Sequence, residues 1–138
     1  MYLKTLKENE KQSFIQLAYE IMNADKVIAD EEMAMIEAYC DEMSIEKPDD
    51  YSTEKANKAK EELSESDLTT RRSVYFELYA LVACDGSYDE TEQVLMNEIR
   101  GAFGISHPEA QKLEKLYDDL QITYNAINNA INGIAYEK

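Results

Sequence analysis

The chain has 138 residues and a formal net charge of −15, from 14 basic and 29 acidic residues. This length is typical of one domain, spanning residues 1–138, and the acidic balance argues against nucleic acid or an anionic membrane as a partner, because both need a basic surface. No apolar run approaches the roughly 20 residues of a membrane span, and Lys4 and Glu8 interrupt the apolar start of a signal peptide, so we expect no direct membrane insertion.

Apolar residues at three- and four-residue spacing predict a helix over Tyr2–Asn23 and a second helix over Asp30–Ser44. Pro48 and the neighbouring aspartates predict a loop over residues 46–50. A weakly amphipathic helix is expected over Ser52–Leu63, and its thin apolar side indicates a peripheral position.

The second half of the chain predicts helices over Leu68–Cys84 and Asp89–Phe103, followed by Gly104 as a C-cap. A capping signal at Ser106 then starts a helical pattern that runs to the end of the chain, with a break expected near Asp118. One apolar stripe follows this last segment, and we expect it to pack across the rest of the protein as core, the alternative being a helix that binds a partner. The stripe consists of Leu113, Leu116, Leu120, Tyr124, Ile127, Ile131 and Ile134. The predicted fold is all-α, with six or seven helices.

The two halves of the chain resemble each other when the sequence is shifted by 60 residues without a gap. Identical residues then coincide at five positions, and apolar residues coincide at several more. A duplicated hairpin of helix, acidic turn and helix is the natural interpretation, over residues ~10–45 and ~70–105. Tyr19 and Tyr79 coincide in this alignment, so we expect them to be buried at equivalent positions. The five identical pairs are Ser13 with Ser73, Tyr19 with Tyr79, Asp25 with Asp85, Glu32 with Glu92 and Ile45 with Ile105.

The turn of the second copy reads ACDGSYDETE over residues 83–92, and that of the first reads DKVIADEE over residues 25–32. This pattern of a small residue, Asp-Gly, an acidic N-cap and Glu resembles the TerB-like tellurite-resistance family, and also the N-terminal domain of membrane-anchored DnaJ-like proteins. The resemblance covers roughly residues 10–120. It implies a compact all-α bacterial domain with an internal repeat, a divalent-metal site at the paired acidic turns, and a role in stress-response or membrane-associated complexes. The first copy departs from the pattern, with Lys26 in place of glycine and Ala29 in place of the acidic N-cap.

Carboxylates are hard oxygen ligands, which suit Ca²⁺, Mg²⁺ or Mn²⁺. One turn offers too few ligands, but two turns brought together by the repeat would offer a full set. The candidate metal ligands are Asp25, Glu32, Asp85, Asp89 and Glu92. Capping of helix N-termini is the alternative explanation for Glu32, Asp89 and Glu92, and an EF-hand is excluded because the twelfth loop positions are Met96 and Ile36.

Enzymatic function finds little support in the sequence. His107 is the only histidine, no nucleophile lies near it in sequence, and there is no phosphate-binding glycine loop or zinc motif. The two cysteines, Cys40 and Cys84, show no metal or redox spacing, which favours a cytoplasmic protein with reduced thiols. We therefore expect a non-enzymatic module that binds a divalent cation or acts as an adaptor to a basic or membrane-associated protein partner. The alternative is a metal-free interaction module with an acidic surface.

Overall fold

The computed structural model of the chain describes residues 1–24, 30–48, 50–83 and 88–133. These residues form a 3₁₀-helix and six α-helices, with no strand within the described ranges, which confirms the predicted all-α fold. The elements are η1 (Leu3–Thr5), α1 (Glu8–Met22), α2 (Asp30–Met43), α3 (Thr53–Ser64), α4 (Leu68–Ala83), α5 (Glu90–Phe103) and α6 (His107–Ile131).

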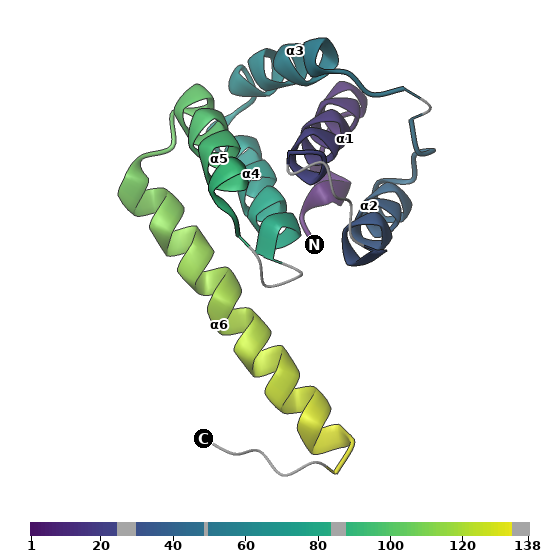
Figure 1. Cartoon of the computed structure of the whole chain (residues 1–138), viewed down its shortest axis with the longest axis vertical. Helices are drawn as coiled ribbons and strands as arrows, with labels where there is room; N and C mark the ends of the chain where they lie inside the picture. Colours follow the sequence, from purple (N-terminus) through teal and green to yellow (C-terminus); the bar gives the residue numbers. More distant parts are fainter. Residues whose placement is uncertain (25–29, 49, 84–87, 134–138) are drawn as a thin grey trace.

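The helices α1 to α5 form a body around one apolar core, and α6 extends from it (Figure 1). α1 packs against α2, α3 and α4, while α5 packs against α3 and α4. η1 lies against both α2 and α4, and α6 packs along α4. The largest fully buried side chains include Phe14, Leu17, Ile36, Leu78 and Phe103, which come from both copies of the predicted hairpin.

The 60-residue repeat in the sequence is accompanied by a repeat in the helices. α1 and α4 start 60 residues apart, at Glu8 and Leu68, and α2 and α5 match at both ends. Residues 60 positions apart are also buried to the same extent. Ile36 and Met96 are both 0 % exposed, and Met43 and Phe103 are 1 % and 0 % exposed. The helices of the two predicted hairpins therefore recur at the predicted 60-residue distance, while the single domain of two superposable hairpins stays a prediction.

The two hairpins also end in the same way. Ser44 and Gly104 follow the last residues of α2 and α5, and both adopt a positive φ, of 57° and 67°. The next amide in each copy closes the helix, from Ile45 to the Cys40 carbonyl at 3.0 Å and from Ile105 to the Arg100 carbonyl at 3.1 Å. This left-handed C-cap favours glycine, so the predicted cap at Gly104 is confirmed, whereas Ser44 holds the same conformation without that freedom.

The expectation that the helix over residues 52–63 is peripheral is wrong. α3 packs along α1 and also reaches α5, and Ala56, Ala59 and Leu63 are all buried. The two alanines have no bulk beyond Cβ, so the backbone of α3 approaches its neighbours closely. A thin apolar side therefore marked close packing here rather than an edge position.

The expectation for the last apolar stripe is also wrong for the part that the structure describes, and Ile134 lies outside the described residues. α6 continues past Asp118 without a break, and only its first half lies on the body. Leu113 and Tyr117 pack against the core, but Leu116, Leu120, Tyr124, Ile127 and Ile131 are exposed. The helix is simply longer than the surface of α4 that it covers (Figure 1). Despite its length, neither α6 nor any other described helix is apolar enough to cross a bilayer.

Candidate functional site

The five predicted metal ligands are only partly described. Asp25 and Asp85 lie outside the described residues. Asp89 is the N-cap of α5, Glu92 is in the first turn of the same helix, and Glu32 is in the first turn of α2. The three described carboxylates therefore lie at the N-termini of two helices, α2 and α5.

Asp89 and Glu92 form a reciprocal capping box. The Glu92 amide donates to Asp89 Oδ1 at 2.8 Å, and the Asp89 amide donates to Glu92 Oε1 at 3.3 Å. Two amides at the start of α5 are thereby satisfied, as the pattern of Asp followed three residues later by Glu predicts. Capping accounts for these contacts, and it leaves one oxygen of each carboxylate outside the box.

Glu32 and Glu92 occupy the same position in the two hairpins, and each is only 4 % exposed. A buried carboxylate is costly unless it accepts hydrogen bonds or meets a cation. The N-terminus of a helix favours negative charge, which offsets part of this cost at both positions. The burial of Glu32 and Glu92 was not predicted from the sequence. Their positions indicated only that each lies in the first turn of a helix.

The residues that the structure describes contain no group of three or more histidine, cysteine, aspartate or glutamate side chains able to hold a metal ion. Glu32, Asp89 and Glu92 therefore do not form such a group by themselves, and a site at the turns would have to include Asp25 or Asp85, which lie outside the described residues. The metal site consequently stays a prediction.

A second cluster, which the sequence analysis missed, joins α4 to α6. Tyr75 donates to Glu114 Oε2 at 2.8 Å, and Tyr79 donates to Asp118 Oδ1 at 3.1 Å. Burial and the neighbouring carboxylates raise the pKa of both hydroxyls, so these tyrosines remain protonated donors at neutral pH. The signal was present as a pair of tyrosines and a pair of acids, each four residues apart, but only the structure shows that they face each other.

The ring of Tyr88 extends this cluster to the start of α5. It packs edge-on against Tyr79 with ring centroids 5.8 Å apart. Burial, with the charges of Glu114 and Glu92 adding to it, raises the pKa of Tyr88 to about 12. A phenol with so high a pKa stays protonated at neutral pH, and its ring contributes to the packing between α4 and the start of α5.

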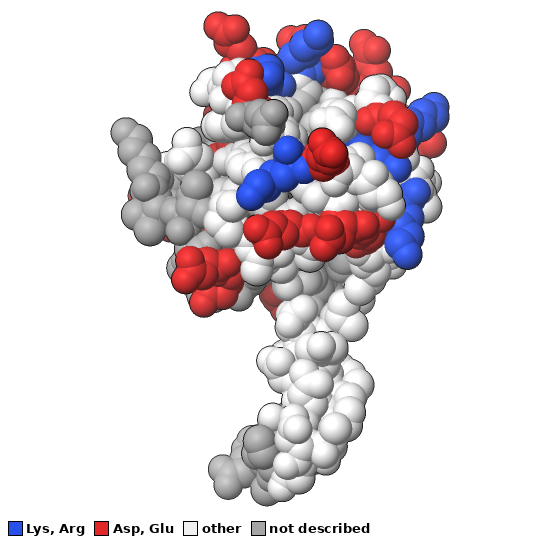
Figure 2. All heavy atoms as spheres, turned by 90° about the vertical axis from the view of Figure 1, so that its right-hand side faces the viewer, with Lys and Arg blue, Asp and Glu red and all other residues white. Residues whose placement is uncertain are grey.

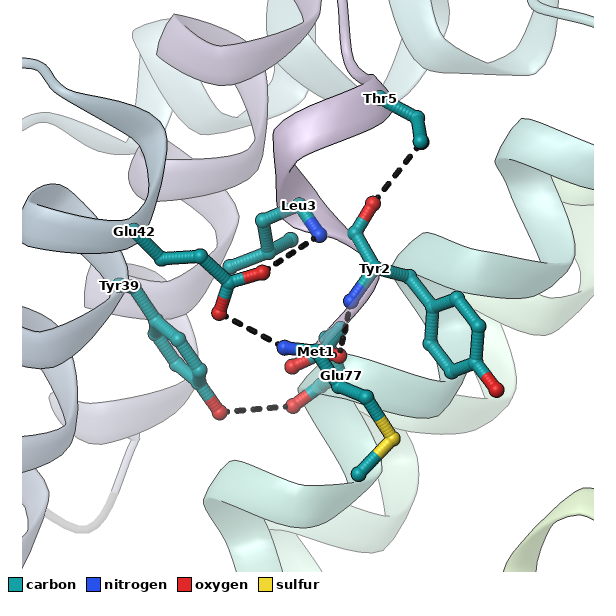
Figure 3. Close-up of polar contacts among 7 residues, drawn as sticks. All are labelled: Met1, Tyr2, Leu3, Thr5, Tyr39, Glu42 and Glu77. Atoms are coloured by element: carbon teal, nitrogen blue, oxygen red, sulfur yellow. Dashed lines mark hydrogen bonds and ion pairs between the residues drawn. The ribbon is translucent and has the colours of Figure 1, made fainter.

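Two further carboxylates meet at the N-terminal end of the chain (Figure 3). Glu42 of α2 accepts the Met1 amine at 2.7 Å and the Leu3 amide at 2.9 Å. Glu77 of α4, whose side chain is 5 % exposed, accepts the Tyr2 amide at 3.1 Å and lies 3.2 Å from the Met1 amine. Glu42 from one hairpin and Glu77 from the other thus hold the start of the chain, including η1, between α2 and α4.

One buried carboxylate is left poorly compensated. Glu20 of α1 is 9 % exposed, and its Oε1 has no hydrogen-bond partner among the described residues. Burial raises its pKa above the ordinary value of 4.5; the charge of Lys60 opposes this effect and that of Glu98 adds to it. Lys60 is itself shared, because its Nζ lies 3.6 Å from Glu98 Oε2.

Glu20 is expected to make the folded protein less stable as the pH rises. Between pH 4.5 and its raised pKa, the folded chain keeps a proton that the unfolded chain has lost, so the free energy of unfolding falls through this window and stays lower above it. Glu20→Gln removes this loss and should stabilise the protein by about 1 kcal/mol at pH 7.5, with little gain near pH 4.

Urea denaturation of wild type, Glu20→Gln and the exposed-site control Glu61→Gln at both pH values measures this effect. A gain that is equal at pH 4 and pH 7.5 would show that burial of the charge is not its cause.

The lone histidine, His107, lies at the start of α6. His107 is the exposed first residue of α6 and lines a shallow cavity of about 180 Å³ together with Tyr75, Arg100 and Glu114. The Arg100 guanidinium donates from Nη1 to the Ile105 carbonyl at 3.0 Å, which fixes it to the end of α5. Glu114, which lines the same cavity, accepts a hydrogen bond from Tyr75 at 2.8 Å.

Comparison with known proteins adds one clear finding. A solved structure of a tellurite resistance protein from Nostoc punctiforme PCC 73102 has the same fold, with a TM-score of 0.64 and 17 % sequence identity. The match covers 96 % of this chain and 86 % of that one. No family model matches the sequence, and no curated protein matches it significantly. The resemblance inferred from the acidic turns is confirmed at the level of the fold: this chain folds as a tellurite resistance protein does.

Proposed function

We propose that the chain is a non-enzymatic adaptor domain of a cytoplasmic stress-response system related to tellurite resistance, and that it binds a basic segment of a partner protein. The likeness of its fold to a tellurite resistance protein supports the stress-response part. The observation that carries the adaptor part is an exposed acidic stripe on α2 that has only one ion pair, a weak one, among the described residues.

This stripe, called the acidic face below, consists of Asp30, Glu37 and Asp41. Their spacing of seven and four residues places all three on the side of α2 opposite its buried residues, and all three are exposed. Glu37 has one weak partner, Lys47, at 3.9 Å, and no ion pair joins Asp30 or Asp41 to a basic residue in the described part of the chain. Figure 2 shows that acidic groups are numerous on the side of the body that includes α2.

Loss of the acidic face should weaken and slow the binding of a basic peptide. Exposed charges attract a basic partner over roughly 10 Å at 0.1 M salt, so association should be fastest at low ionic strength. We expect Asp30→Asn with Asp41→Asn to reduce affinity for an oligolysine peptide about 10-fold or more in 50 mM salt, as measured by calorimetry.

The matched control is Glu90→Gln with Glu65→Gln, because it removes the same charge from other exposed sites and Glu90 is the repeat equivalent of Asp30. Equal losses in the two double variants would show that net charge, and not the acidic face, governs binding. In cells, deletion of the gene should lower tolerance to tellurite, and only the control variant should restore it. Unchanged tolerance after deletion would contradict the stress-response role.

A divalent cation is the second candidate, and the equivalent burial of Glu32 and Glu92 favours it. Two carboxylates that are each 4 % exposed sit beside the two acidic turns of a chain with a net charge of −15. Ca²⁺, Mg²⁺ or Mn²⁺ bound between the turns would take Glu32 and Glu92 as ligands together with Asp25, Asp85 and Asp89.

A further inference from the structure

The last three turns of α6 form an exposed apolar arm, defined here as residues 120–131. Tyr124 is 57 % exposed, Ile127 is 52 % exposed and Ile131 is 75 % exposed. The arm contains no Asp, Glu, Lys or Arg, although 31 % of the whole chain is charged. Figure 2 shows the arm as an uncharged shaft below the body. Exposed apolar surface of this kind marks an interaction site.

The arm continues a seam that the protein already uses. Leu113, Tyr117, Leu120, Tyr124, Ile127 and Ile131 follow the alternating four- and three-residue spacing of a coiled coil. The first part of the seam lies on the body, where the ring of Tyr117 packs 5.8 Å from Phe76 and 5.7 Å from Tyr79. From Leu120 onward the same stripe has left the body and is open to solvent.

The residues beside the seam indicate what covers it. In coiled coils, charged residues flanking the apolar positions select a partner of opposite charge. The flanking residues of the arm are Gln121, Thr123, Asn128 and Ala130, and none is charged. Two copies of this arm would therefore meet without repulsion, even though two bodies of net charge −15 repel each other. A membrane surface fits less well, because helices that lie on membranes carry Lys and Arg along their polar side.

The direction in which the two arms pair follows from the negative charge of the two bodies. A parallel pair would place both acidic bodies side by side, whereas an antiparallel pair places them at opposite ends. Antiparallel pairing also uses the groove at the base of the arm, a cavity of about 530 Å³ whose lining includes Tyr2, Phe76, Leu113, Leu116 and Leu120.

The length of the arm suits this arrangement. The distance from Leu113 to Ile131 along the helix is roughly 27 Å, which is five turns. With the pair centred near residue 122, Leu120 of one copy faces Tyr124 of the other, and Leu113 faces Ile131. The end of each arm then lies against the groove of the other copy, so that both apolar surfaces are buried by one symmetric contact.

We propose that two copies of this chain dimerise through antiparallel pairing of their α6 arms, with the end of each arm seated in the apolar groove of the other copy. This interface is separate from the acidic face on α2, which remains exposed in the dimer. Because the arms are uncharged and the bodies repel, the dimer should become tighter, not weaker, as salt is added.

The full chain should sediment at twice its monomer mass at tens of micromolar. Ile127→Glu places a charge in the seam of both copies and should weaken dimerisation at least 100-fold. Asn125→Glu adds the same charge to an exposed position off the seam and should leave the dimer intact. Sedimentation equilibrium at 50 mM and 500 mM salt measures these changes. Circular dichroism at a concentration low enough for both variants to be monomeric should show the same helix content and melting profile for the two.

Small-angle scattering tests the direction, because an antiparallel dimer is elongated with its bodies far apart. A wild-type chain that remains monomeric at 200 μM would overturn the proposal, as would equal effects of Ile127→Glu and Asn125→Glu. A compact dimer would overturn the antiparallel arrangement. Binding of wild type to phosphatidylcholine vesicles that is lost in Ile127→Glu, without dimerisation, would assign the arm to a membrane surface instead.

Discussion

Truncation of Tyr79 to alanine is expected to lower the free energy of unfolding by about 3–5 kcal/mol. Tyr79 is 8 % exposed, and its ring packs edge-on against Tyr88 and Tyr117 at centroid distances of 5.8 and 5.7 Å. Removing the ring leaves a cavity where α4, α5 and α6 meet and releases Asp118 from its hydrogen bond. For a domain with a total stability of roughly 5–15 kcal/mol, this loss would bring the protein close to unfolding.

Tyr19 provides the matched control, because it occupies the same position in the first hairpin. The expectation that both tyrosines are buried is wrong for Tyr19, which is half-buried and packs against Tyr51 with ring centroids 5.8 Å apart. Tyr19→Ala should therefore cost only about 1 kcal/mol. Tyr79→Phe keeps the ring and should cost about 1 kcal/mol through its lost hydrogen bond. Urea denaturation measures all three variants, and similar losses at Tyr79 and Tyr19 would contradict the asymmetry of the two hairpins.

Divalent cations are expected to produce the second large effect if the acidic turns bind metal. At a free concentration about 100 times the dissociation constant, one site adds about 2.7 kcal/mol of stability. In a domain of this size the melting temperature would rise by about 5 °C. Thermal melting in EDTA, and then in millimolar Ca²⁺, Mg²⁺ or Mn²⁺, measures this shift.

Variants of the turns separate metal binding from capping. Asp85→Asn should abolish most of the cation-induced shift and leave the melting temperature in EDTA nearly unchanged or higher, because it removes one repelling charge. Glu92→Gln tests the capping box itself, since a glutamine can still accept from the Asp89 amide, now 3.3 Å from Glu92 Oε1. If wild type shows no shift with any of the three ions, or Asp85→Asn shifts equally, the carboxylates serve as caps and the metal-free adaptor is the better account.

The features that the sequence predicted well are local. The predicted ends of α2 to α5 differ from the observed ends by no more than one or two residues. Capping residues such as Asp89, Glu92 and Gly104 act on their own backbone neighbours, so the local sequence contains the information. The repeat was also predictable, since an ungapped 60-residue shift preserves the apolar positions on which helix packing depends. The first helix was less well predicted: residues 3–5 form the separate η1, and α1 begins only at Glu8.

The features that the sequence did not predict depend on contacts between distant elements. The apolar spacing correctly predicted that α6 is a helix. Spacing alone cannot show that α6 extends beyond α4, so it could not show that Tyr124 and Ile131 are exposed. The pairing of Tyr75 with Glu114 and of Tyr79 with Asp118 spans 39 residues, and nothing local to either helix specifies it. Of the candidate metal site, the sequence predicted the capping acids but not the burial of Glu32 and Glu92 at 4 % exposure, which depends on how the two hairpins pack.

The contact of η1 with α4 also constrains how the chain folds during synthesis. The Tyr2 amide cannot donate its hydrogen bond to the Glu77 carboxylate until Glu77, which lies 75 residues later in the chain, has been made. At 5–20 residues per second, roughly 4–15 s pass between translation of these two residues. During this time the α1–α2 hairpin can form, but η1 can be held only by Glu42, so its final position is set when α4 leaves the ribosome. Tyr2 and Leu3 precede α1 in the chain, yet their position is fixed only after α4 has been made, so the docking of η1 reports that α4 has joined the α1–α2 hairpin.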